Sequence, residues 1–152
     1  MSKVVRKYRY GMLAFLLSFL VGCIVVLPNT ILGKGLFFLG PDFNLQQMIF
    51  GEVINYSLKD GSYLWTWFND LGSNFIGTFS FYNLFSPFNI ISYFFPATWY
   101  PYLCSFLMII KFGVAGLTSY LFMRRYVKDK KLVLLGSLLY SFSGFQLTNM
   151  LF

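Results

Sequence analysis

Charged side chains are scarce in this sequence. Only 11% of its 152 residues are Asp, Glu, Lys or Arg, whereas 57% are hydrophobic and 22% are aromatic. About a quarter of the residues of a typical soluble domain are charged. The composition therefore argues against a water-soluble fold and indicates a protein whose solvent is a lipid bilayer.

Nucleic-acid-binding motifs are also absent, although the formal net charge is +7. The sequence has no Gly-rich phosphate loop and no motif of interleaved basic and aromatic residues. Its basic residues instead gather in two short clusters, at positions 3–9 and 124–131, each at the end of an apolar segment. Clusters of this kind set the orientation of membrane helices, so we expect a membrane-lipid partner and no nucleic acid.

Cysteine is nearly absent too, with only Cys23 and Cys104, both in apolar segments. Neither has a His or a second Cys nearby, so we expect no structural disulfide and no cysteine metal site. The stretch "LVGC" ending at Cys23 resembles a lipoprotein cleavage box, which keeps a lipoprotein signal open as an alternative. The residues after Cys23 stay apolar where a lipoprotein would turn polar, which favours an uncleaved membrane anchor.

Long apolar runs are what the sequence does contain. Segments at about 10–32, 101–123 and 132–152 are each long enough to cross the hydrocarbon core, which takes about 20 helical residues. If both basic clusters are cytoplasmic, residues 124–131 form a cytoplasmic loop and about 33–99 form an outer loop. The predicted fold is all-α and polytopic, in the plasma membrane, with three transmembrane helices and interfacial or juxtamembrane helices in the outer loop.

A fourth apolar stretch, residues 79–96, does not fit as a span. A crossing there would place the second basic cluster outside the cell. The stretch is also interrupted by Pro87 and by polar residues such as Asn83, Ser86 and Asn89. We interpret it as a re-entrant or interfacial segment whose aromatic residues, with Trp99, suit the headgroup region.

The outer loop opens with a single carboxylate, Asp42, among apolar neighbours. The segment from Pro41 to about Gly61 predicts a helix with a polar side (Asn44, Gln47, Gly51, Glu52, Asn55 and Lys59) and an apolar side (Leu45, Ile49, Phe50, Val53, Ile54 and Tyr56). Asp42 and Gln46 fall on the apolar side, one turn apart. A carboxylate on a buried face is costly unless it has a partner or a task. The simpler alternative is that Asp42 is the N-cap of the helix, which is a favoured use of Asp.

Motifs in series resemble the loop and helices of bacterial YfhO-type membrane proteins. The first is Gly40, Asp42 and Gln46 in "GPDFNLQQMIF", a G-x-D with Gln four residues after the Asp. The others, in chain order, are Trp67, Gly72-Ser73-Asn74-Phe75, Phe81-Tyr82, Ser86-Pro87-Phe88-Asn89, Lys111 with Gly116, and Tyr140 with Ser143 and Gly144. The resemblance extends over nearly the whole chain.

The resemblance implies a chemistry. YfhO-type proteins are similar to GT-C glycosyltransferases, which use polyprenyl-phosphate sugar donors outside the membrane and decorate polymers such as lipoteichoic or wall teichoic acids. It implies that Asp42 is catalytic, as the general base that takes the proton of the acceptor hydroxyl. Lys111 would bind the donor phosphate, and Gln46, Asn74 and Asp70 would be further substrate contacts. A divalent metal is possible in such enzymes, although the sequence shows no cluster of oxygen ligands and so assigns no metal site.

Other readings stay open. YfhO-type proteins are several-fold longer, and the polar residues of the third apolar segment (Ser137, Ser141, Ser143, Gln146, Thr148 and Asn149) predict burial against further helices. We therefore expect the single membrane domain 1–152 to be the N-terminal part of a longer protein and to be inactive alone. The alternatives are a transporter or lipid-handling protein in which Asp42 and Lys111 are coupled, and a non-catalytic membrane anchor. Lys111 could also simply extend its ammonium to the interface, and Glu52 is most simply solvated.

Overall fold

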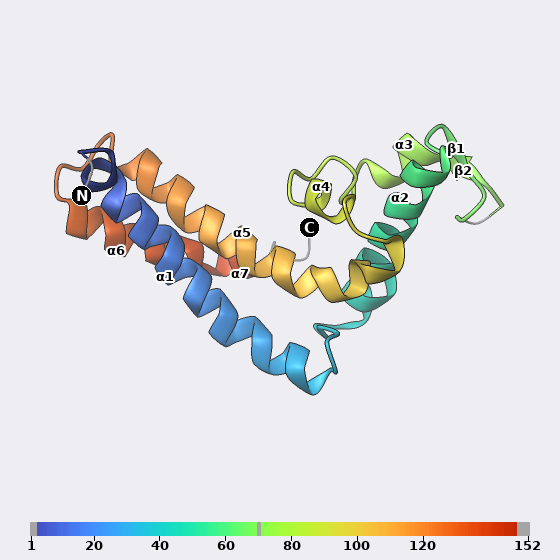
Figure 1. Cartoon of the computed structure of the whole chain (residues 1–152), viewed down its shortest axis with the longest axis horizontal. Helices are drawn as coiled ribbons and strands as arrows, with labels where there is room; N and C mark the ends of the chain where they lie inside the picture. The colour runs from blue at the N-terminus through green and yellow to red at the C-terminus, as the bar shows by residue number, and fades with distance from the viewer. Residues whose placement is uncertain (1–2, 70, 149–152) are drawn as a thin grey trace. The chain divides into compact units, whose positions relative to one another are not determined.

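The computed structural model describes residues 3–69 and 71–148, and it is mostly helical (Figure 1). The elements, in chain order, are α1 (Lys3–Leu32), a π-helical turn η1 (Phe43–Gln47), α2 (Met48–Asp60), β1 (Trp65–Thr66), β2 (Ser73–Asn74), α3 (Phe75–Phe79), α4 (Asn89–Ser92), a 3₁₀ turn η2 (Ala97–Trp99), α5 (Tyr100–Met123), α6 (Lys130–Ser141) and α7 (Gly144–Thr148). They form two compact units. Among the described residues, unit 1 contains α1 as far as Pro28 and residues 108–148, and unit 2 contains Asn29–Leu107.

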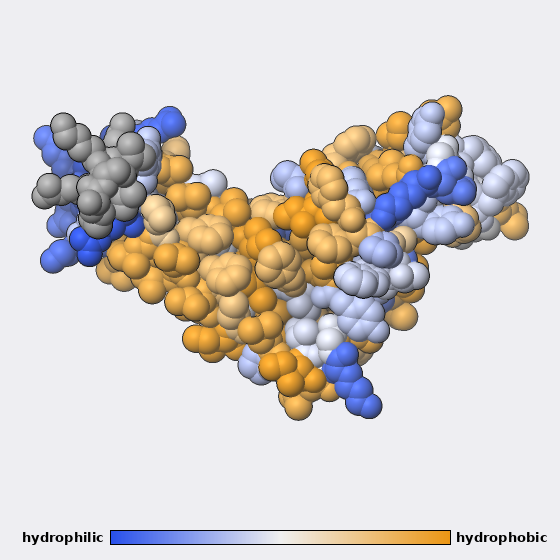
Figure 2. Space-filling model, in the orientation of Figure 1, coloured by the Kyte–Doolittle hydropathy of each residue, from blue (hydrophilic) through white to orange (hydrophobic). Residues whose placement is uncertain are grey.

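Two helices in the described part of the chain are long and apolar enough to cross a membrane. They cover Tyr8–Leu32, 25 residues with a mean hydropathy of 2.5, and Ala97–Met123, 27 residues with a mean hydropathy of 1.7. Both lie where the sequence predicts spans. Large apolar side chains on α1 face outward, with Ile24 71% exposed and Leu32 86% exposed. Figure 2 shows hydrophobic residues along the visible lengths of α1 and α5, and hydrophilic residues gathered where α1 begins. An outward apolar surface of this kind is what lipid requires.

Small residues let the helices of unit 1 approach closely. Gly116 of α5 faces α1, and a Cβ added there would overlap the Ser18 hydroxyl and lie 2.9 Å from the Ala14 carbonyl oxygen. Ser18 in turn donates a hydrogen bond of 3.2 Å to the Ser141 hydroxyl of α6, and both serines are fully buried. Small residues and buried hydroxyls at helix contacts are typical of membrane helix packing, where apolar burial alone gives little driving force.

The third apolar segment is interrupted. The prediction of one continuous helix over 132–152 is wrong for its described part, because α6 ends at Ser141 and α7 starts at Gly144. Phe142 and Ser143 separate them, and the Ser143 hydroxyl accepts a hydrogen bond of 3.4 Å from the Gln146 amide. Ser-x-x-Gln is the sequence signature of a helix start, so this residue pair begins a new helix at that point. The 12 residues of α6 reach about 18 Å, and a third span stays a prediction; residues 149–152 lie outside the described chain.

Unit 2 is built around α2. The helix ends where the sequence predicts, at Gly61, whose φ of +85° is the left-handed conformation that glycine adopts at low cost. One face of α2 packs with α3 and the following turn in a core of Ile54, Phe75, Phe79 and Leu84. Strands β1 and β2 form an antiparallel ladder of two residue pairs, with Trp65 opposite Asn74. The sequence did not predict these strands.

Residues 79–96 contain turns and the four-residue helix α4, and no helix of spanning length. This agrees with the prediction that residues 79–96 do not cross the membrane. Polar residues of the segment turn inward, since Asn89 is 2% exposed and Ser92 is fully buried. Aromatic residues of the same segment turn outward, with Phe81 76% exposed and Phe94 83% exposed. The interfacial or re-entrant placement of this segment stays a prediction.

Candidate functional site

Asp42 lies in the first turn of a firmly held helix. The helical backbone starts at Pro41, and the Asn44 amide nitrogen donates to the Gly40 carbonyl oxygen over 3.0 Å. The Asn44 side chain fixes the loop before it: its Oδ1 accepts from the Leu39 and Gly40 amides at 3.2 and 3.4 Å, and its Nδ2 donates to the Phe37 carbonyl at 2.9 Å. The segment from Phe37 to Asn44 is therefore one hydrogen-bonded frame that carries Asp42.

The Asp42 carboxylate does not cap this helix. Its backbone is helical, with φ −62° and ψ −38°, and its side chain makes no capping hydrogen bond. The N-cap alternative is therefore wrong, because Pro41 already belongs to the helix and shifts Asp42 into the first turn. A carboxylate in the first turn interacts favourably with the helix dipole, and the Asp42 side chain is exposed on the surface.

The predicted burial of Asp42 and Gln46 is also wrong, since both side chains are exposed. The predicted apolar face lies only partly inside, since Leu45 is 66% exposed whereas Ile54 is fully buried. On the predicted polar face, Gln47 is 4% exposed and Asn55 is fully buried. One reason is the π-helical turn at Phe43–Gln47, which takes up an extra residue and rotates the first turn away from a regular 100° pattern. The second reason is that the interior of unit 2 recruits polar side chains.

A set of polar residues, which sequence reasoning missed, joins α2 to the segment 83–95. Gln47 and Asn55 in this set are buried, Asn83 is half-buried and Lys59 is exposed. Asn83 Nδ2 donates to Gln47 Oε1 over 2.9 Å, and Asn55 Nδ2 donates to the Ser92 carbonyl over 2.7 Å and to the Phe95 carbonyl over 3.5 Å. The Lys59 ammonium, one turn after Asn55, also donates to the Phe95 carbonyl. Polar residues recurring within apolar stretches were the only signal in the sequence, and their partners are 36 to 40 residues away.

Tyr93 closes this polar set on the side of α4. Its hydroxyl donates to the Leu84 carbonyl over 3.0 Å and accepts from Asn89 Nδ2 over 3.4 Å. Burial raises the pKa of the Tyr93 phenol, and the hydrogen bond from Asn89 opposes part of that rise. The phenol is therefore neutral over the physiological range and acts as a structural hydrogen-bonding group.

Glycine permits a close contact between α2 and the start of α5. A Cβ added at Gly51 would overlap the ring of Tyr100, which is 3% exposed. The aromatic ring therefore lies directly on the α2 backbone at Gly51. This contact and the polar set hold α2, and with it the Asp42 turn, within unit 2.

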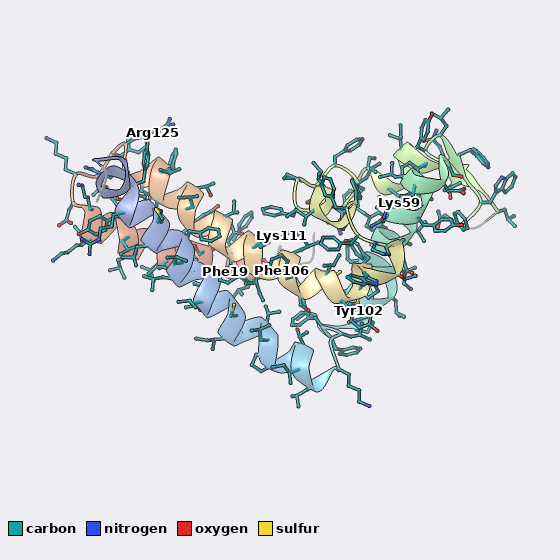
Figure 3. The ribbon with its side chains drawn as sticks, in the orientation of Figure 1. Phe19, Lys59, Tyr102, Phe106, Lys111 and Arg125 are labelled. Carbon is teal, nitrogen blue, oxygen red and sulfur yellow. The ribbon has the colours of Figure 1, made fainter. Side chains whose placement is uncertain are left out.

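The remaining predicted site residues have separate positions. Asn74 is the N-cap of α3, where its Oδ1 accepts a hydrogen bond of 2.7 Å from the Gly77 amide, and its side chain is exposed. Lys111 belongs to unit 1; it lies near the middle of α5 and is half-buried (Figure 3). Asp70 lies outside the described residues. The structure thus places Asp42 and Gln46 together on one exposed turn, whereas Asn74 caps the N-terminus of α3.

Metal ligands do not cluster in the part of the chain that the structure describes. Within residues 3–69 and 71–148, no group of three or more His, Cys, Asp or Glu side chains is arranged to hold a metal ion. Asp42 is accompanied by the amide of Gln46 on its own turn and by the Asn44 frame. The arrangement offers a solvent-facing carboxylate on a fixed backbone, which suits proton transfer or hydrogen bonding to a hydroxyl.

The two apolar helices of spanning length are consistent with a helical membrane protein. The family model described as "Bacterial membrane protein YfhO" matches residues 14–152. The chain therefore belongs to the YfhO family, as the series of motifs predicts. No curated protein and no solved structure matches the chain.

Proposed function

We propose that this chain is the N-terminal part of a GT-C type membrane glycosyltransferase. The enzyme would transfer a sugar from a polyprenyl-phosphate donor to an extracytoplasmic acceptor such as a lipoteichoic or wall teichoic acid. The observation that carries the proposal is the position of the G-x-D carboxylate in this YfhO-family chain. The Asp42 side chain is exposed and makes no capping hydrogen bond, and it lies on the turn that the Asn44 hydrogen bonds hold. A structural carboxylate would be expected to engage a partner within the fold.

In this proposal Asp42 acts as the general base. Its carboxylate accepts the proton of the acceptor hydroxyl while that oxygen attacks the anomeric carbon, and the polyprenyl phosphate leaves with the electrons of the broken C–O bond. The exposed amide of Gln46, on the same turn, would hydrogen-bond the acceptor or the sugar. Asn74 and Asp70 remain proposed substrate contacts, with Asn74 using its Oδ1 for the cap.

Lys111 is the proposed partner of the donor phosphate. A lysine within a membrane span is costly and is commonly functional, and its ammonium offers three donors to phosphate oxygens. Its half-buried position on an apolar helix supports this role. The proposed topology follows from the basic clusters. Residues 1–10 and 124–131 are cytoplasmic, and the loop at about 33–99 is outside, in a multi-pass arrangement.

The test is Asp42→Asn in the longer protein of which we predict this chain to be the start. The substitution keeps size and polarity and removes the base, so sugar transfer should fall by roughly 10²–10⁴-fold, with unchanged membrane levels. Asp60→Asn is the matched control, because Asp60 is an exposed carboxylate on α2 that bonds only to its neighbour Ser62 among the described residues.

Transfer at the wild-type rate in Asp42→Asn would remove the proposed base. Absence of transfer by the wild-type protein with any polyprenyl-phosphate sugar, together with movement of lipid or solute across proteoliposomes, would instead favour the transporter alternative. Neither activity in the intact protein would favour the non-catalytic anchor.

A further inference from the structure

A pocket of about 170 Å³ opens beside α2 in unit 2, and none of the residues that line it is among the predicted site residues. It is lined by Glu52, Val53, Tyr56 and Phe68. Glu52 and Tyr56 are one helical turn apart on the same face of α2, and Phe68 comes from the connection between β1 and β2. The pocket therefore lies where the strand connection folds against the helix.

Two aromatic rings form a corner of this pocket. The ring centroids of Tyr56 and Phe68 are 5.1 Å apart and their planes are nearly perpendicular, at 85°. Val53 adds a further apolar side chain to the lining. In this edge-to-face contact one ring packs against a face of the other, and the ring faces that stay open attract a cation.

The charge of the pocket is negative and uncompensated within the described chain. Glu52 is the one charged residue among the four that line it, and its carboxylate forms no hydrogen bond or ion pair with any residue in 3–69 or 71–148. Lys59, two turns further along α2, does not neutralise it, because the Lys59 ammonium donates to the Phe95 carbonyl. A half-buried carboxylate beside aromatic faces adds a negative charge to a site whose rings already attract cations.

We propose that this pocket binds an alkylated ammonium group, of the kind carried by choline. A quaternary ammonium has no N–H donors to satisfy, so apolar walls cost it little, while the π faces and the Glu52 carboxylate attract its charge. Two other ligand classes fit worse. A hard cation such as Ca²⁺ requires six to eight oxygen ligands, and this pocket supplies one carboxylate. A neutral sugar requires several hydrogen-bonding partners that the valine and phenylalanine walls do not offer.

The experiment uses the whole 152-residue chain in nanodiscs of phosphatidylglycerol, which has no ammonium group. Choline is titrated by ligand-observed NMR and calorimetry against 3,3-dimethyl-1-butanol, a neutral molecule of the same shape. Choline should bind at least roughly tenfold more tightly than the neutral molecule, and Glu52→Gln and Tyr56→Leu should each weaken choline roughly tenfold. Asp60→Asn, which removes an exposed carboxylate of the same helix outside the pocket, should leave choline binding unchanged.

Equal binding of choline and its neutral counterpart would overturn the proposal, since the pocket would then be only apolar. So would a loss in Asp60→Asn as large as that in Glu52→Gln, which would assign binding to diffuse surface charge. Absence of choline binding, in a chain whose tryptophan emission shows unit 2 folded, would also overturn it. A second arm with phosphatidylcholine nanodiscs identifies the source: competition by the lipid would support a bilayer headgroup, and unchanged choline affinity would support a soluble ammonium ligand.

Discussion

Asn55→Asp is a sharp probe of the polar set in unit 2. The native amide is fully buried, and its Nδ2 points at two carbonyl oxygens, 2.7 Å from Ser92 and 3.5 Å from Phe95. Aspartate has the same shape but replaces this donor with an oxygen. An ionised carboxylate would face two acceptors at these distances, whereas a protonated carboxyl could still donate one hydrogen bond to the Ser92 carbonyl.

The expected cost depends on pH in a defined direction. Burial and the two carbonyl oxygens favour the protonated form, so the pKa of the introduced carboxyl is raised in the folded state. An aspartate is unperturbed at about 3.9 in an unfolded chain. The folded variant therefore keeps its stability below about pH 4 and loses it as the pH rises through the raised value. If burial tightens proton binding roughly a thousandfold, the loss approaches about 4 kcal/mol at pH 8.

The assay is urea unfolding in detergent micelles at pH 4, 6 and 8, followed by tryptophan emission. The three tryptophans, Trp65, Trp67 and Trp99, all lie in unit 2, so the signal reports that unit. Gln46→Glu is the matched control, because it makes the same chemical change on an exposed residue of the π-helical turn before α2 and should shift the free energy of unfolding little. An Asn55→Asp variant as stable at pH 8 as at pH 4, each measured against wild type, would refute the assigned burial and hydrogen bonding.

Two further predictions concern topology and Lys111. The topology test uses a chain with both native cysteines replaced by alanine. Leu71→Cys, at a position 93% exposed, should react with an impermeant maleimide added outside cells, whereas Lys128→Cys should react only after the membrane is opened. The reverse pattern would contradict the proposed orientation. In the longer protein, Lys111→Met should stay inserted, because the substitution removes a costly charge from the span. The variant should need a several-fold higher concentration of polyprenyl donor in liposomes, and Lys111→Arg should restore part of the wild-type donor affinity. An unchanged donor requirement would assign the lysine to a structural contact or to the interface.

Sequence alone determined the features that depend on local composition. Two apolar runs of spanning length became α1 and α5, and helices of this length and composition suit the hydrocarbon core. Gly61 ended α2, because glycine adopts the left-handed backbone conformation at that position at low energetic cost. A series of short motifs, each local in the chain, predicted the family. Each of these conclusions rests on residues close together in the chain.

Only the tertiary structure decided which face of α2 is inside. Hydrophobic periodicity placed Leu45 inward and Asn55 outward, and both assignments were wrong. Lipid can cover an exposed leucine, but a buried carbonyl such as that of Ser92 needs a donor, so the polar side chain turns in. The donor and the acceptor are 37 residues apart. A partner that distant leaves no mark on the local pattern, and it appears only once the chain has folded back on itself.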